Sequence, residues 1–144
     1  LMLNGIPKCI SPELLYVLDK MGHGDEIVIS DGNFPGESVG KDNIVIRSDG
    51  TGVPELLEAI LQLMPLDTYA DCVFLMDKTE SDRELEIPIW DEYRRILKDH
   101  TAQNVHFIER QAFYDRAKKA YAVVVTGESA IYANVLLKKG VVKQ

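Results

Sequence analysis

The densest group of chemically useful side chains in the sequence surrounds one histidine. His23 stands between two glycines and is followed by Asp25 and Glu26. The glycines leave its imidazole unobstructed, and histidine is the side chain whose ordinary pKa suits proton transfer near neutral pH. A histidine at the end of a helix is also favoured by the helix dipole alone. The local sequence therefore leaves two interpretations open, a general acid and a surface residue at a helix end.

Further polar side chains flank the predicted strands. Asp31 follows the first strand, Asp67 precedes the third and Arg110 follows the fourth. Ligands of parallel α/β sheets bind beyond the carboxyl ends of strands, which directs attention to these three residues. The two aspartates also suit turns, and a lone arginine most often pairs with a surface acid. Ligand contacts and these structural roles both stay open.

Phenol and amide groups complete the set of candidates. Tyr114 offers a hydroxyl beside Arg110, and the segment 132–134 (Tyr-Ala-Asn) is short and polar enough to line a pocket. Core or interface packing of the tyrosines and a turn before the last strand are the alternatives. His100 and His106 lack partners at metal-ligand spacing, so we expect no metal. Together these residue types favour acid/base chemistry without a cofactor on a small polyhydroxy ligand.

One segment imitates a nucleotide-binding motif. The run 50–55, Gly-Thr-Gly-Val-Pro-Glu, has the first two glycines of the dinucleotide fingerprint, but Glu55 stands where the third glycine belongs. Its carboxylate would lie close to the pyrophosphate, and Pro54 removes a backbone donor from the helix start. A tight turn into a helix explains the glycines, so the sequence disfavours a Rossmann-like nucleotide-binding domain.

Composition excludes several other classes of protein. The 144 residues are 46% hydrophobic and 27% charged, with a formal net charge of −7. An acidic surface repels phosphate backbones and anionic lipid, so we expect neither a nucleic-acid nor a membrane partner. No apolar run approaches the roughly 20 residues that span a bilayer, and the N-terminus does not resemble a signal peptide. Cys9 and Cys72 lack the spacing of a disulfide scaffold or zinc site, which favours a cytoplasmic protein.

The hydrophobic periodicity alternates between helix and strand. Helices are predicted over 12–21, 53–64, 89–97 and 113–120, and strands over 26–30, 44–47, 73–76, 105–108 and 121–126, followed by an apolar stretch over 134–137. The acidic segment 77–86 is predicted to be a solvated loop. Such alternation predicts the α/β class, a single domain with a mainly parallel sheet flanked by helices.

Several short motifs occur in a fixed order along the chain. They are 21–26 (Met-Gly-His-Gly-Asp-Glu), Asp31 with 33–35 (Asn-Phe-Pro), 47–50 (Arg-Ser-Asp-Gly), 65–69 (Pro-Leu-Asp-Thr-Tyr), 113–117 (Phe-Tyr-Asp-Arg-Ala), 126–128 (Thr-Gly-Glu) and 132–134 (Tyr-Ala-Asn). This ordered set resembles the RbsD/FucU family, and most of all its L-fucose mutarotase branch. The resemblance covers residues 2–142 and implies one domain with the RbsD-like fold.

The resemblance also implies an activity and a set of site residues. Members of the family interconvert the anomers of monosaccharides, and the ribose branch also interconverts pyranose and furanose rings. His23 matches the proton donor of the family, and Tyr114 matches a second catalytic position. The substrate-binding positions that the resemblance implies are Asp31, Asp67, Arg110, Tyr132, Ala133 and Asn134. No cofactor is expected, and L-fucose is the expected substrate.

Two alternatives to an L-fucose mutarotase remain within this resemblance. Ala133 stands where fucose mutarotases commonly have glycine and is similar to the ribose branch, which leaves a D-ribose pyranase open. Arg110 and the pair Phe113-Tyr114 favour the fucose branch. A sugar-binding module without turnover is the second alternative. The family also implies a cytoplasmic homo-oligomer, a decamer with sites near subunit interfaces.

Overall fold

The helices begin at signals that the sequence carries. Helix α1 (Pro12–Lys20) starts where the Ser11 hydroxyl accepts the backbone N–H of Leu14 at 3.1 Å, with proline at the first helical position. Helix α5 (Arg110–Lys118) starts three residues before the predicted position. The reason is Glu109, whose carboxylate accepts the N–H groups of Gln111 and Ala112 and so caps the helix early.

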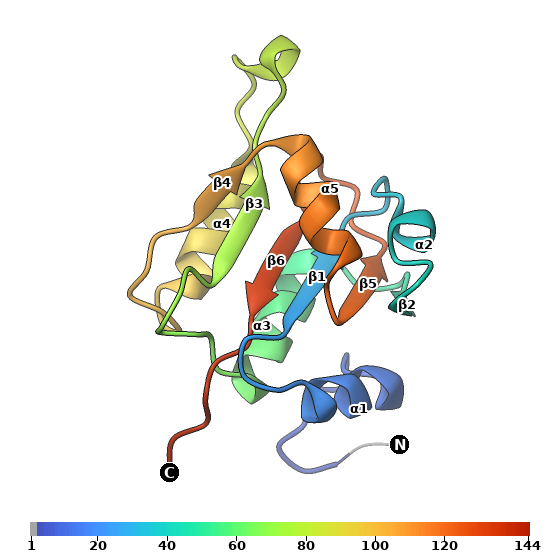
Figure 1. The fold of residues 1–144 in the computed structure, drawn as a ribbon, viewed down its shortest axis with the longest axis vertical. Coiled ribbons are helices and arrows are strands. Elements are labelled where there is room, and N and C mark those ends of the chain that lie inside the picture. The colour runs from blue at the N-terminus through green and yellow to red at the C-terminus, as the bar shows by residue number, and fades with distance from the viewer. Residues whose placement is uncertain (1–2) are drawn as a thin grey trace.

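The computed structural model describes residues 3–144, and the predicted α/β class is confirmed (Figure 1). The strands are β1 (Glu26–Ser30), β2 (Ile44–Ser48), β3 (Val73–Met76), β4 (His106–Ile108), β5 (Ala122–Thr126) and β6 (Val135–Lys138). Besides α1 and α5, the helices are α2 (Gly36–Val39), α3 (Val53–Leu63), the 3₁₀ turn η1 (Glu80–Asp82) and α4 (Pro88–Leu97). The prediction missed α2 because four residues carry too little periodicity to distinguish a helix from a turn.

One six-stranded sheet organises the chain. Its strand order is β2-β5-β1-β6-β3-β4, and every neighbouring pair is parallel except the two pairs that β6 makes with β1 and β3. The mainly parallel sheet was predicted. The reversed direction of β6 was not, since hydrophobic periodicity carries no information on strand direction.

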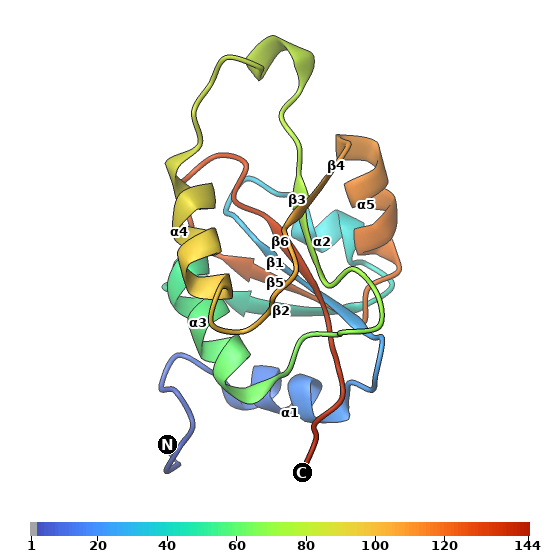
Figure 2. The same cartoon turned by 90° about the vertical axis from the view of Figure 1, so that its left-hand side faces the viewer.

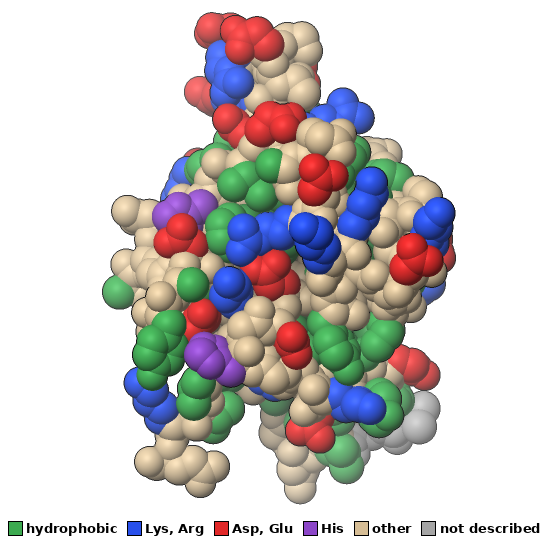
Figure 3. All heavy atoms as spheres, in the orientation of Figure 1, with side chains coloured by type: hydrophobic (Ala, Val, Ile, Leu, Met, Phe, Trp, Pro, Cys, Tyr) green, Lys and Arg blue, Asp and Glu red, His purple; other side chains and the backbone are tan. Residues whose placement is uncertain are grey.

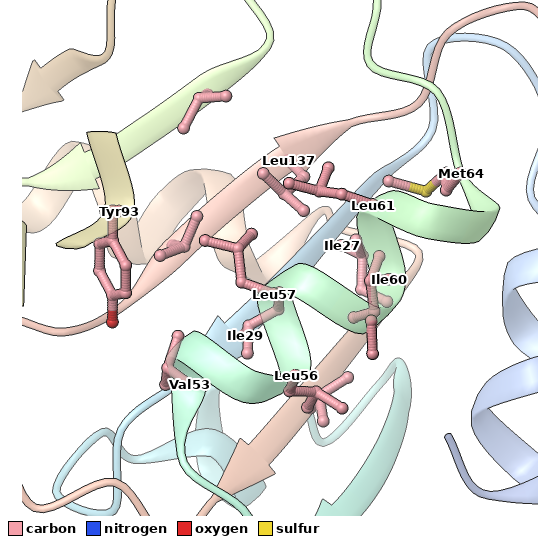
Figure 4. Packing of buried hydrophobic residues seen from close by; sticks show 14 of the residues in the cluster. Ile27, Ile29, Val53, Leu56, Leu57, Ile60, Leu61, Met64, Tyr93 and Leu137 are labelled. Carbon is pink, nitrogen blue, oxygen red and sulfur yellow. The ribbon is translucent and has the colours of Figure 1, made fainter. Parts of the chain in front are cut away.

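Both faces of the sheet are covered by helices. Figure 2 shows α3 and α4 on one side of the sheet and α2 and α5 on the other. Side chains alternate between the two cores: Ile27 and Ile29 of β1 pack with α3 and α4, whereas Val28 packs beneath α2 and α5. Figure 4 shows the first core, where Leu57 and Ile60 of α3 point at the sheet. Burial on both faces accounts for the nearly continuous apolar strands.

The antiparallel strand β6 determines which loops meet at each edge of the sheet. Its first residue, Val135, pairs with Ile29 near the end of β1, and its last residue, Lys138, pairs with Glu26 at the start of β1. The residues just before β6 therefore lie beside the residues just after β1. Residues that precede β1 and β3 lie at the opposite edge, beside the chain that leaves β6.

The loop between β3 and α4 projects from the rest of the molecule. It contains η1 and extends beyond the carboxyl end of β3 (Figures 1 and 2). Figure 3 shows acidic and basic side chains together on this projection and interspersed over the same face of the domain. Within residues 3–144, no helix is both long and apolar enough to cross a membrane.

Candidate active site

A cavity of about 210 Å³ lies at the carboxyl ends of β1 and β3. Its volume is below the roughly 300–1,000 Å³ typical of drug-sized ligands and suits a single small ring. The lining combines polar and apolar side chains: Asp31, Asn33, Phe34, Met76, Thr79, Arg110, Tyr114, Ile131, Tyr132 and Asn134. Five of the residues that we predicted for the site, namely Asp31, Arg110, Tyr114, Tyr132 and Asn134, are brought together here.

Asp31 is held in the cavity by the backbone around it. One carboxylate oxygen accepts the N–H groups of Asn33 at 3.0 Å and Phe34 at 2.9 Å, and the other accepts the N–H of Ala133 at 3.3 Å. Burial raises the pKa of Asp31, and these three hydrogen bonds partly offset that rise. The arrangement fixes the carboxylate in direction, as a group that orients a ligand requires.

Asn134 presents hydrogen-bond donors beside Asp31. Its side-chain oxygen accepts the N–H of Asp31 at 2.8 Å, which turns the amide nitrogen away from the sheet. This nitrogen has no hydrogen-bond acceptor among the described residues, although the side chain is almost fully buried. A buried amide with free N–H groups at a cavity wall is suited to a hydroxyl oxygen of a ligand.

Arg110 and Tyr114 form the wall contributed by α5. The Arg110 side chain donates from Nε to the Tyr114 hydroxyl at 3.4 Å, and its guanidinium lies 5.4 Å from the centre of the same ring. Phe34 packs edge-on against that ring at 5.4 Å. The early start of α5 places Arg110 in its first turn, one helical turn from Tyr114, so the two side chains meet at the cavity.

Tyr132 has a strained backbone that helix α4 holds in place. Among residues 3–144 it is the one non-glycine residue with a positive φ, 54°, a conformation that costs on the order of 1–3 kcal/mol. The indole N–H of Trp90 donates to its carbonyl at 2.7 Å, and the Tyr93 hydroxyl donates to the next carbonyl, of Ala133, at 2.6 Å. Two hydrogen bonds from one helix thus hold the backbone that directs the Tyr132 side chain at the cavity.

Ala133 does not line the cavity. Its side chain is fully buried, and its contribution is the backbone N–H that Asp31 accepts. In this chain Ala133 therefore positions Asp31 through its main chain. Its methyl group, which a glycine at this position would lack, is buried and does not face the cavity.

His23 and Asp67 lie at the opposite edge of the sheet. The ring Nε2 of His23 donates to an Asp67 carboxylate oxygen at 3.0 Å, which also accepts the N–H of Tyr69 at 3.1 Å. These bonds, the one from Tyr69 first, hold the pKa of Asp67 below its usual range although burial opposes them. An ionised carboxylate only accepts, so the proton of this pair is on Nε2 and Nδ1 is left for another partner.

The strand pairing explains why His23 and Asp67 meet although 44 residues separate them. Gly24 donates to the carbonyl of Lys139 at 2.9 Å, and Asp67 donates its N–H to the carbonyl of Lys138 at 3.0 Å. Both loops are therefore bound to the chain that leaves β6. The His23 side chain is 46% exposed. The imidazole thus faces outward from a buried Asp67.

One chain therefore carries the predicted site residues in two separate groups. Strand β1 has five residues, so its ends are roughly 16 Å apart, with His23 before it and Asp31 after it. No side chain bridges that distance. The geometry separates a sugar-sized cavity from a histidine–aspartate pair.

Several residues that shape these two groups were missed by the sequence analysis. Met76, Thr79 and Ile131 line the cavity. Gln103 donates from its amide nitrogen to the carbonyls of Asp67 at 3.1 Å and of Ala70. Met76 ends a buried strand and resembles a core residue, and Gln103 is distant in sequence from the loop that it holds, so neither carried a local signal.

The N-terminus of α3, where the sequence imitates a dinucleotide fingerprint, is bound by a side chain of the protein itself. The Glu128 carboxylate accepts the N–H of Val53 at 3.1 Å in the first turn of α3. A phosphate at this position would meet a carboxylate of the same sign. The antiparallel β6 at the centre of the sheet also differs from the parallel Rossmann order. Among the described residues, no three His, Cys, Asp or Glu side chains are grouped as metal ligands.

Comparison with known proteins relates the whole chain to one family. Residues 4–142 match the RbsD / FucU transport protein family. The chain is 54% identical to the fucose mutarotase of Danio rerio over 145 residues, which cover 98% of this chain and 95% of that protein. The crystal structure of the fucose mutarotase from Streptococcus pneumoniae in complex with L-fucose matches with a TM-score of 0.92 and 47% identity, over 98% of this chain and 100% of that one.

A more distant structure shares the fold. The structure of Bacillus subtilis RbsD complexed with D-ribose matches with a TM-score of 0.78 and 21% identity, over 99% of this chain and 100% of that one. The predicted RbsD-like fold is confirmed by this match. With a family match over nearly its full length and relatives at about half identity, the chain belongs to the RbsD/FucU family.

Proposed function

We propose that this protein is an L-fucose mutarotase, a carbohydrate isomerase that interconverts the α and β anomers of L-fucose. The observation that carries the proposal is identity of about half the residues over nearly the whole length of fucose mutarotases. The cavity adds independent support, because it has the size of one sugar ring and a lining that alternates polar and apolar groups.

The lining favours fucose over ribose as the substrate. L-Fucose has a methyl group on C5, which D-ribose lacks. Phe34, Met76 and Ile131 supply apolar surface to the cavity beside the polar side chains of Asp31 and Asn134. Burial of one methyl group contributes about 0.8 kcal/mol, a modest but real preference.

For mutarotation, a protein has to supply only groups that transfer protons. An acid protonates the ring oxygen of the sugar while a base removes the proton of the anomeric hydroxyl. The bond between C1 and the ring oxygen breaks, the aldehyde rotates, and the ring closes on the other face of C1. Positioned acid and base groups contribute roughly 10²–10⁴-fold to such a step.

The cavity residues have roles that suit this reaction. Asp31, Arg110 and Asn134 hold the sugar hydroxyls, Asp31 as acceptor and the other two as donors. Tyr114, polarised by the Arg110 guanidinium, shares in the proton transfer at the same wall. Tyr132 binds the sugar from the loop between β5 and β6.

His23 is the general acid, supplied by a second copy of the chain. Within one chain the imidazole lies at the opposite edge of the sheet from the cavity and is 46% exposed. Asp67 orients the ring through Nε2, which leaves Nδ1 to give its proton to the ring oxygen when the imidazole is protonated. A homo-oligomer in which the His23 edge of one subunit covers the cavity of another completes the site; the resemblance suggests a decamer.

Saturation-transfer NMR of the anomeric protons tests the proposed function. With catalytic amounts of protein, irradiation of the α-anomer signal of L-fucose is expected to reduce the β-anomer signal, and the effect is expected to be weaker for D-ribose. Exchange on ribose without exchange on fucose would instead identify a pyranase. Sugar binding that leaves anomer exchange at its rate in buffer would identify a binding module.

A further inference from the structure

Tyr132, which lines the cavity, has a neighbour on the projecting loop that the sugar-binding role does not explain. The hydroxyl of Tyr132 lies 2.5 Å from a carboxylate oxygen of Asp82, a residue of η1 that lies outside the cavity lining. The backbone N–H of Thr79 donates to the same hydroxyl at 3.2 Å. Both partners come from a segment that the sequence indicated only as a solvated acidic loop.

Counting donors and acceptors determines how Tyr132 can meet a ligand. A phenol has one proton to donate, and a carboxylate can only accept, so the proton of Tyr132 is directed at Asp82. The Thr79 N–H uses one lone pair of the phenol oxygen. The Thr79 hydroxyl lies 3.2 Å from the same oxygen and also within reach of Asp82, and with its proton on Asp82 the second lone pair of the phenol stays free. Tyr132 therefore meets a sugar hydroxyl only as an acceptor, which is the role of a base rather than an acid.

The surroundings of Asp82 indicate that its contact with Tyr132 is a defined part of the structure and not a chance contact between surface side chains. The Thr79 hydroxyl also donates to the Asp82 carboxylate, at 3.4 Å. The Tyr132 backbone has a positive φ, and the indole of Trp90 donates to its carbonyl, so the main chain from which the phenol extends is held in place. Both Tyr132 and Asp82 are half-buried. By contrast, Glu80 in the same turn is 94% exposed and contacts only Arg83, at 3.8 Å.

We propose that Asp82 is a positioning residue that makes Tyr132 the general base of the reaction and finally receives the proton. On ring opening, the anomeric hydroxyl gives its proton to the Tyr132 oxygen, and Tyr132 gives its own proton to Asp82. The electron pair of the former O–H bond forms the C=O bond. The pair of the C1–O bond goes to the ring oxygen, which takes a proton from the imidazolium. Ring closure reverses each transfer.

This inference rests on the proposed function, and the kinetics of three single variants test it. Asp82→Asn keeps a side-chain oxygen that accepts from Tyr132 but cannot take up the proton, so kcat for L-fucose is expected to fall at least tenfold while KM changes less than about threefold. Asp82→Glu restores the carboxylate and is expected to recover most of kcat. Glu80→Gln removes a charge from the same turn and is expected to leave both constants unchanged.

A double-mutant cycle separates this role from a general effect on the loop. If Asp82 acts only through Tyr132, the substitution Asp82→Asn has no further effect on kcat in a Tyr132→Phe background. A kcat of Asp82→Asn within about twofold of wild type, or losses that multiply in the double variant, would overturn the inference. Absence of anomer exchange by the wild-type protein would instead reject the proposed function, and the inference with it.

Discussion

Two carboxylates of the candidate site have opposite electrostatic surroundings. Burial raises the pKa of Asp31, whereas hydrogen bonds from Tyr69 and from His23 lower the pKa of Asp67. Environments that push the pKa values of two acids apart are typical of sites in which the acids have different roles. Here Asp67 stays ionised beside the imidazole, and Asp31 is the carboxylate that we propose to contact the sugar.

Replacement of His23 is the first prediction at the scale of residues. His23→Ala removes the proposed proton donor, and because the side chain is 46% exposed the variant is expected to fold. We expect the rate of anomer exchange to fall by about 10²-fold or more, measured by saturation transfer on L-fucose. His100→Ala, which changes a histidine of the segment after α4, is the control. Near-wild-type exchange by His23→Ala would remove this residue from the mechanism.

Asp67 gives a prediction on pH and stability. Because its pKa is lowered in the folded protein, the unfolded chain binds more protons in the acid range. The stability that Asp67 contributes is therefore present above its ordinary pKa of about 4 and is lost as the pH falls through the lower folded value. Asp67→Asn is expected to unfold at a lower temperature than wild type near pH 7, and the difference is expected to shrink toward pH 3.

Thermal unfolding across this pH range checks the linkage. The exposed Asp99 offers a matched control, since Asp99→Asn removes the same charge without removing a partner of His23. If the difference in unfolding temperature between wild type and Asp67→Asn stays constant with pH, the ionised form of Asp67 contributes nothing to stability.

At the scale of elements, the sequence predicted most of the fold but not the direction of one strand. Capping residues and apolar periodicity located α1, α3 and α4 because those signals are local. The antiparallel β6 and the early start of α5 depend on partners elsewhere in the chain. Both features are needed to form the cavity, so its shape could not be predicted from local pattern.

The turn after β5 packs closely against the backbone of the loop after β2. A Cβ atom on Gly127 would overlap the backbone carbonyl of Asp49, whereas a Cβ on Gly50 would meet open space. Gly127→Ala is therefore expected to lower the free energy of unfolding by about 1–3 kcal/mol. Gly50→Ala is expected to change it by less than about 0.5 kcal/mol. Denaturant unfolding of the two variants measures the difference, and equal stabilities would contradict this packing.

At the scale of the molecule, the candidate site residues could be predicted from the sequence, but their separation into two groups could not. The resemblance lists His23 and Asp31 together, and only the position of β1 between them shows that one chain cannot join them. The proposed function therefore requires a second copy of the chain to complete the site. Light scattering is therefore expected to give a mass that is a multiple of the 16.2 kDa chain.

Complementation between inactive variants tests the shared site. His23→Ala and Arg110→Ala each disable one group, so each homo-oligomer is expected to be nearly inactive. Oligomers refolded from an equal mixture are expected to regain about one quarter of wild-type activity, the fraction of sites that receive both native residues. A mixture no more active than the sum of its components would show that each site lies within a single chain.

The rate at which freshly dissolved α-L-fucose approaches its equilibrium optical rotation tests the central claim most directly. The account predicts that the rate constant rises in proportion to the concentration of wild-type protein while the final rotation stays unchanged, since a catalyst does not move the equilibrium. If the rate constant stays at its value in buffer while the sugar saturates the protein, the assignment of this protein as an L-fucose mutarotase is contradicted.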